Sequence, residues 1–175
     1  MKIFVSLLIA SFALTGCANT QQSKYTDGKV VDCSKINSAE GAGVELLCVG
    51  DSSITNFDSL RGPMILNVWG TWCAPCKEEL PLIRKFHDSY IDQVQVVGLN
   101  VEETNKEVVK PFIKSHGIVW PSLYDPDGRT REVIGMGVPV TWFIDSNGKV
   151  VHKKIGAFLS YKELEDLAVK FFNLQ

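Results

Sequence analysis

The sequence lacks features that mark several large classes of protein. No apolar run reaches the ~18 residues that a helix needs to cross a bilayer, so no membrane-spanning segment is predicted. The formal net charge is only −2, which argues against nucleic acid as a partner. The three histidines stand far apart, at positions 87, 116 and 152, and offer no close set of metal ligands. We therefore expect neither a bound metal nor a cofactor.

The N-terminus has the pattern of an export signal. Lys2 precedes an apolar stretch over residues 3–14, which has the length of a signal-peptide core. It ends in Leu-Thr-Gly-Cys at 14–17, which resembles the lipobox of bacterial lipoproteins, where cleavage leaves Cys17 as a lipidated N-terminus. Because two or more acyl chains anchor a protein stably, we expect a signal peptide over 1–16, a lipidated flexible tether over 17–29 and attachment to the extracytoplasmic face of the cell membrane. The alternative is an ordinary secretory signal with a chance cysteine; either way the protein works where disulfides persist.

The other four cysteines divide into two pairs. Cys73 and Cys76 stand two residues apart in Trp-Cys-Ala-Pro-Cys, directly after an apolar run and before a helical pattern. A thiolate is easiest to hold at the start of a helix, so this pair is predicted to be redox-active. Cys33 and Cys48 remain, and we expect a structural disulfide that closes a loop of about 15 residues and adds ~3 kcal/mol. A second redox pair or a metal site is the alternative, although the two cysteines lack the close spacing of zinc ligands.

Hydrophobic periodicity predicts strands that alternate with helices. The expected strands are 64–69, 94–99, 140–145 and 149–155, with a short extended piece at 120–124; the expected helices are 76–90, 101–116 and 160–172. Before them, residues 45–49 and 54–60 indicate an N-terminal hairpin extension. This order predicts an α/β fold, with a mixed central sheet and helices on both faces. The dithiol then lies at the C-terminal end of the first core strand, where such sheets place their chemistry.

Three local signals refine these elements. Asn147-Gly148 between the last two strands favours a type I′ turn. Ser160 with Glu163 three residues later indicates a capping box at the start of the final helix. Acidic residues 102 and 103 suit the N-terminal end of the helix expected over 101–116.

Two segments carry a resemblance to a known family. Residues 67–81 (Asn-Val-Trp-Gly-Thr-Trp-Cys-Ala-Pro-Cys-Lys-Glu-Glu-Leu-Pro) look like the active-site segment of TlpA/ResA-like thioredoxin-fold proteins, and Gly137-Val138-Pro139 resembles that family's cis-proline segment. The resemblance implies a thioredoxin-like domain, which we assign to residues 30–175. It also implies a cis bond before Pro139 that presents the backbone of Val138 to a partner's extended chain. Without the resemblance, a trans proline in a turn would be expected.

The resemblance also implies roles for the active-site residues. Cys73 would attack a disulfide and Cys76 would resolve the mixed disulfide, while Trp72 and Pro75 shape the rim.

A carboxyl group completes the predicted site. Asn67 stands where thioredoxin has a buried aspartate, and the TlpA/ResA-like group often carries a glutamate three residues after its second cysteine, here Glu79. An apolar groove would raise the pKa of Glu79 and make it an acid/base near neutral pH. Alternatively, Glu79 is solvated together with Glu78.

The function implied by this resemblance is disulfide reduction outside the membrane. The usual clients are apocytochrome c thiols, and a membrane electron donor would re-reduce the dithiol, so the expected partners are the thiols and disulfides of exported proteins. A disulfide-forming oxidase is the alternative within the same chemistry. A copper chaperone is disfavoured because its cysteines are spaced by three residues and His152 is the only late histidine here. A peroxidase would need threonine where the chain has Gly70.

Overall fold

The computed structural model describes residues 25–135 and 137–174. The predicted signal peptide, Cys17 and the first part of the predicted tether lie outside the described residues. Within the described part of the chain, no helix combines the length and the apolar character needed to cross a membrane.

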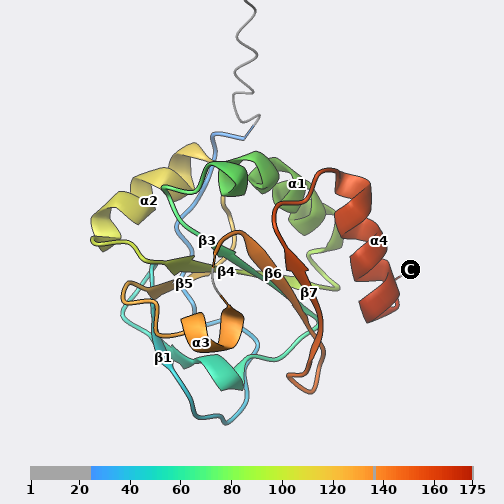
Figure 1. The fold of residues 1–175 in the computed structure, drawn as a ribbon, viewed down its shortest axis with the longest axis horizontal. Coiled ribbons are helices and arrows are strands. Elements are labelled where there is room, and N and C mark those ends of the chain that lie inside the picture. Colours follow the sequence, from blue (N-terminus) through green and yellow to red (C-terminus); the bar gives the residue numbers. More distant parts are fainter. Residues whose placement is uncertain (1–24, 136, 175) are drawn as a thin grey trace, which may run out of the picture.

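The chain alternates between strands and helices (Figure 1). The strands are β1 (Glu45–Cys48), β2 (Ile54–Asn56), β3 (Met64–Trp69), β4 (Gln95–Val101), β5 (Ser122–Asp125), β6 (Val140–Ile144) and β7 (Val150–Ile155). The helices are α1 (Ala74–Tyr90), α2 (Lys106–Ser115), α3 (Arg131–Ile134) and α4 (Tyr161–Phe172), with a 3-10 turn over Phe57–Ser59.

In the described residues the strands form one sheet in the order β2-β1-β5-β4-β3-β6-β7. Strands β3, β4 and β5 run parallel, whereas β6, β7, β1 and β2 join by antiparallel pairing. The predicted mixed sheet and N-terminal hairpin are therefore confirmed. The extended piece expected at 120–124 becomes a parallel core strand, because β5 pairs with β4 on one side and β1 on the other.

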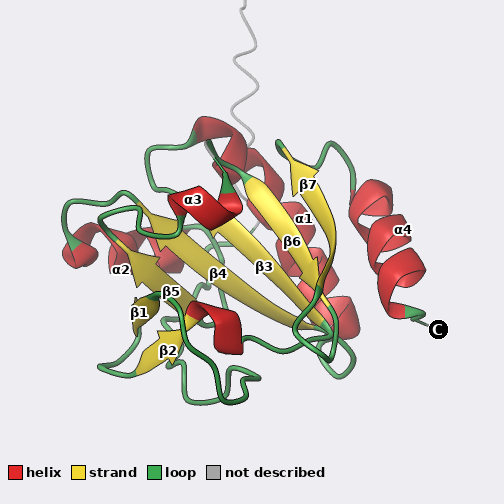
Figure 2. Cartoon of the chain, turned by 60° about the horizontal axis from the view of Figure 1, so that its bottom comes forward, coloured by secondary structure: helices red, strands yellow, loops and turns green. Residues whose placement is uncertain are grey.

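Helices cover both faces of the sheet, but unevenly (Figures 1 and 2). The three long helices α1, α2 and α4 share one core cluster on the same face, together with Ile65 and Trp69 of β3. The other face packs α3, the 3-10 turn and the N-terminal extension against Leu66 and Val68 of the same strand. Strand β3 is buried on both sides, which explains its continuous apolar sequence.

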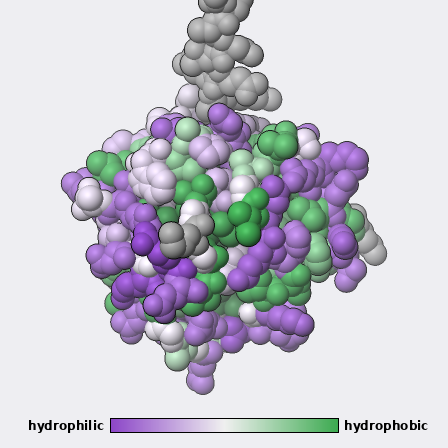
Figure 3. Space-filling model, in the orientation of Figure 1, coloured by the Kyte–Doolittle hydropathy of each residue, from purple (hydrophilic) through white to green (hydrophobic). Residues whose placement is uncertain are grey.

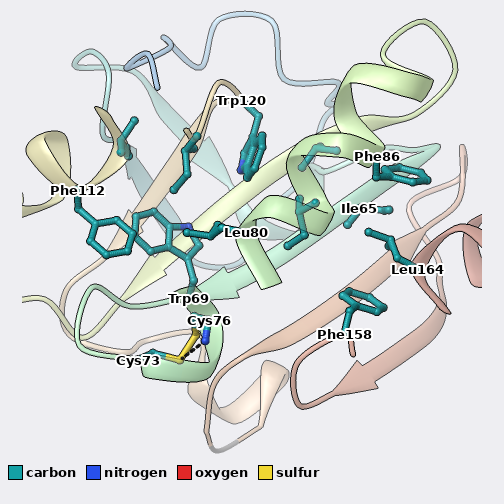
Figure 4. Packing of buried hydrophobic residues seen from close by; sticks show 14 of the residues in the cluster. Ile65, Trp69, Cys73, Cys76, Leu80, Phe86, Phe112, Trp120, Phe158 and Leu164 are labelled. Atoms are coloured by element: carbon teal, nitrogen blue, oxygen red, sulfur yellow. Dashed lines mark hydrogen bonds between the residues drawn. A yellow bond between two sulfur atoms is a disulfide. The ribbon is translucent and has the colours of Figure 1, made fainter. Parts of the chain in front are cut away.

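The core directly supports the dithiol. Trp69, at the end of β3, stacks on Phe112 of α2 with ring centroids 5.2 Å apart. Figure 4 shows the Cys73–Cys76 disulfide at the edge of this cluster, next to Trp69 and near Leu80 of α1. The buried indole of Trp69 thus packs in the same apolar cluster as the disulfide and supports it from below.

The second helix begins later than predicted. Strand β4 continues to Val101, and α2 starts only at Lys106, after Asn105, whose side chain accepts a hydrogen bond from the Glu107 N–H at 2.8 Å. Glu102 has φ of 56°, a left-handed conformation that no α-helix accommodates. Acidic residues 102 and 103 therefore belong to the loop before the helix, and Asn105 is its true cap.

The β6–β7 turn also differs from the prediction. The Gly148 N–H bonds to the carbonyl of Asp145, and Asp145 N–H bonds to the carbonyl of Lys149. Only Gly148 of the turn has positive φ, whereas a type I′ turn needs it at Asn147 too. The Asp145 carboxylate accepts the N–H groups of Asn147 and Lys149 at 2.9 Å and so favours this alternative turn. The predicted cap of the last helix is confirmed, since the Ser160 side chain accepts from the Glu163 N–H.

The packed domain begins before residue 30. Gly28 N–H bonds to the Lys114 carbonyl and Lys29 N–H to the Ile118 carbonyl, so residues 25–29 lie against the domain rather than in the expected flexible tether. Further along, Cys33 and Cys48 form a disulfide with a Cα–Cα distance of 5.8 Å. Both are buried, and the bond links the N-terminal extension to β1.

Candidate active site

The dithiol forms the N-terminal cap of α1. Cys73 and Cys76 are joined by a disulfide with Cα atoms 5.3 Å apart. Cys73 is the cap residue, and its Sγ accepts the Cys76 N–H at 3.2 Å. Pro75 follows in the first turn, where no helical partner for an N–H is needed. The free N–H groups and the positive dipole end of α1 therefore lie at the sulfur of Cys73, where they favour a thiolate after reduction.

Accessibility differs little between the two cysteine residues in the disulfide form. Cys73 is 4% exposed and Cys76 is 1% exposed, whereas the neighbouring Trp72 is 53% exposed. The position at the helix end, rather than exposure, is thus what distinguishes Cys73 from Cys76.

Glu79 is enclosed behind the dithiol. Its side chain has no exposed surface, while Glu78 points to solvent, so the alternative of a solvated carboxylate pair is wrong. Asn67 Nδ2 donates to Glu79 Oε1 at 2.8 Å, and the Phe158 N–H donates to Oε2 at 3.0 Å. Burial raises the pKa of Glu79 from its ordinary 4.5 to about 7, against the opposing effect of these two hydrogen bonds. The carboxyl can thus gain or lose a proton near neutral pH.

A row of polar residues crosses the sheet beneath Glu79. Asn67 of β3 is paired with Thr141 of β6, which is paired with Lys154 of β7. Asn67 Nδ2 also donates to Thr141 Oγ1 at 3.1 Å. Thr141, Lys154 and the Phe158 N–H were not predicted as site residues. The local sequence does not show which polar residues of a strand point toward a helix.

The loop before the dithiol is held by another buried acid. Glu103, only 6% exposed, accepts the Thr71 N–H at 2.5 Å through Oε1, and its backbone carbonyl accepts the Tyr124 hydroxyl at 2.9 Å. This contact was not predicted, because the sequence pattern placed Glu103 at the start of a helix.

The proline segment lies beside the dithiol loop. The Val138–Pro139 bond is cis, as expected; the Gly62–Pro63 bond is also cis, which was not expected. Val140 pairs with Val68 near the end of β3, so Pro139 lies next to the strand end that leads to Cys73.

A pocket opens between Trp72 and Val138. It has a volume of about 240 Å³, and its lining includes the apolar residues Val68, Val101 and Ile134. Arg131 of α3 and Glu102 also line it and form an ion pair with each other. Figure 3 shows apolar surface gathered near the middle of the face that Figure 1 presents. The pocket was not predicted, because α3 has only four residues and too little periodicity to be recognised.

Comparison with known proteins defines the class of this dithiol protein. ResA of Bacillus thuringiensis (strain Al Hakam), a thiol-disulfide oxidoreductase, is 35% identical over 138 residues, covering 77% of this chain and 73% of ResA. The thiol:disulfide interchange protein DsbE of Pseudomonas fluorescens biotype C is 30% identical over 123 residues, covering 70% and 67%. The crystal structure of StoA from Bacillus subtilis matches with a TM-score of 0.58 at 26% identity, covering 73% of this chain and 98% of StoA.

These similarities establish a thioredoxin fold and a thiol-disulfide oxidoreductase of the TlpA/ResA type. The model of the AhpC/TSA family matches residues 42–153, and the chain belongs to that family.

Proposed function

We propose that the protein is a membrane-anchored, extracytoplasmic oxidoreductase that reduces disulfides of exported proteins, such as apocytochrome c. The observation that carries the proposal is the disulfide at the start of α1 with the buried Glu79 one helical turn behind Cys76. Residues three apart on a helix share a face, so this carboxyl serves the second sulfur rather than the first.

The exchange begins at Cys73. Its thiolate attacks one sulfur of a client disulfide, forms a mixed disulfide and releases the other client sulfur as a thiolate. Cys76 then gives its proton to the Glu79 carboxylate, and the Cys76 thiolate attacks the Cys73 sulfur. The Cys73–Cys76 bond forms, the second client thiolate leaves, and two electrons have passed to the client. Glu79 returns its proton to solvent or to the leaving thiolate, and a membrane electron donor re-reduces the dithiol.

The client would bind across the rim of the site. Trp72 and Pro75 are exposed there, and Val138 precedes β6 with its backbone placed to pair with an extended chain. The pocket beside Trp72 accepts an apolar client side chain, as expected for a partner that is still unfolded.

Trapping tests the client and the order of attack. In a Cys76→Ser variant, Cys73 should retain exported proteins as mixed disulfides that reductant releases, whereas the matched Cys73→Ser variant should retain none. Equal trapping by both variants would refute the assigned order. The direction of electron flow is tested by the redox potential of the Cys73–Cys76 pair. A value of about −120 mV would assign the protein to disulfide formation instead of reduction.

The anchor is tested separately at Cys17. We expect the wild-type protein in the membrane fraction and a Cys17→Ser variant to lose lipid labelling and that attachment. Membrane attachment and labelling that survive the substitution would refute lipidation at this residue.

A further inference from the structure

Lys154 occupies a position that the exchange mechanism leaves unexplained. It lies in β7, in register with Thr141, which is itself in register with Asn67. Directly paired residues point to the same face of a sheet, so these three side chains form one row on the α1 side. Glu79 of α1 lies against that row and accepts a hydrogen bond from Asn67.

The ammonium group of Lys154 binds the turn that follows β7. Its Nζ donates to three consecutive carbonyls, those of Ile155, Gly156 and Ala157, at 3.4, 3.5 and 3.2 Å. The next residue is Phe158, whose N–H donates to Glu79 Oε2, and the same Nζ lies 5.7 Å from the Phe158 ring centre. The contacts of Lys154 thus hold the turn in the shape that directs this N–H to the carboxyl of Glu79.

The charges around Glu79 come from two neighbouring elements. Among the described residues, Lys154 of β7 favours the ionised carboxylate and Glu163 of α4 opposes it. These two residues pair with each other at 3.4 Å, and the Lys154 side chain is only 21% exposed. The uncharged neighbours are Asn67, Thr141 and the Phe158 N–H, with Cys76 one turn away on α1.

We propose that Lys154 is a positioning residue for Glu79: its ammonium group fixes the turn after β7 and so directs the Phe158 N–H to the carboxyl of Glu79. The proposal rests on the acid/base role proposed above for Glu79. Lys154 would thereby set the pH range in which Cys76 can pass its proton to the carboxylate.

A direct test is the titration of Glu79 in the full-length, disulfide-form protein, followed by the NMR signal of its ¹³C-labelled carboxyl. A Glu79→Gln variant assigns the signal. Lys154→Met should raise the titration midpoint by about 0.5 pH units or more, since it removes a favourable charge and loosens the turn. Lys154→Arg should stay close to wild type, and Glu163→Gln should lower the midpoint.

The neighbouring lysine supplies the control. Lys153 is exposed and lies over the Trp142 ring, so Lys153→Met removes the same charge from the same strand without touching the Glu79 row. Its midpoint should equal that of wild type. A Lys154→Met midpoint that is unchanged or lower overturns the proposal. If that variant does not fold, Lys154→Gln decides, because a midpoint equal to that of wild type there overturns the proposal as well.

A kinetic readout separates this inference from the proposed function. The rate at which Cys76 resolves a glutathione mixed disulfide on Cys73 should move along the pH axis in the same direction as the NMR midpoint. A rate profile that stays fixed while the midpoint moves would refute the catalytic role of Glu79. Failure to trap clients would instead refute the assigned function and leave the Lys154 result standing.

Discussion

Neutralising Glu79 should change how the stability of the protein depends on pH. Burial raises the pKa of this carboxyl from 4.5 to about 7, so between these values the folded state holds a proton that the unfolded state has lost. The free energy of unfolding therefore falls as pH rises through this range, and the contribution is complete only below 4.5. At ~1.4 kcal/mol per pH unit, the loss amounts to about 3 kcal/mol.

The assay is urea denaturation of the disulfide-form protein from about pH 4 to about pH 8, for wild type and Glu79→Gln. All other carboxyl groups are common to both proteins, so their contributions cancel in the difference. The wild-type protein should lose about 3 kcal/mol relative to the variant across this range. The exposed neighbour provides a control, since Glu78→Gln should show no such change. A difference between wild type and Glu79→Gln that is constant with pH would refute the raised pKa.

Three further changes test the rest of the structure. Replacing both Cys33 and Cys48 by serine should lower the free energy of unfolding by about 3 kcal/mol, measured with urea, because the bond spans 15 residues. Gly98→Ala would place a Cβ 2.8 Å from Trp69 Nε1 and should cost roughly 1–3 kcal/mol, seen as a lower melting temperature. Trp72→Ala should change stability by less than about 1 kcal/mol, since this side chain is 53% exposed, while slowing turnover of peptide disulfides and sparing that of a small-molecule disulfide. Equal slowing of both substrates would contradict a client-binding role.

The position of the dithiol could be predicted because its signals are local. An apolar run, two cysteines spaced by two residues and a helical pattern follow one another directly, so the sequence around the cysteines is enough to indicate a strand, a cap and a helix. The start of α2 could not be found in the same way. Glu102 comes directly after β4 and has a left-handed backbone. Its N–H bonds to the carbonyl of Asp125 at the end of β5. That contact depends on two strands being side by side.

The sequence by itself determined the α/β order, the family resemblance and the pair of sulfurs at the head of α1, since each depends on spacing along the chain. The resemblance pointed to Glu79, but only the tertiary structure decided that this carboxyl is buried rather than solvated, and which of Lys153 and Lys154 lies near it. The partner that closes the site over Glu79, the Phe158 N–H, lies 79 residues away along the chain. A carboxyl's proton affinity depends on the water it has lost and on the charges that surround it, and both are properties of the packed fold.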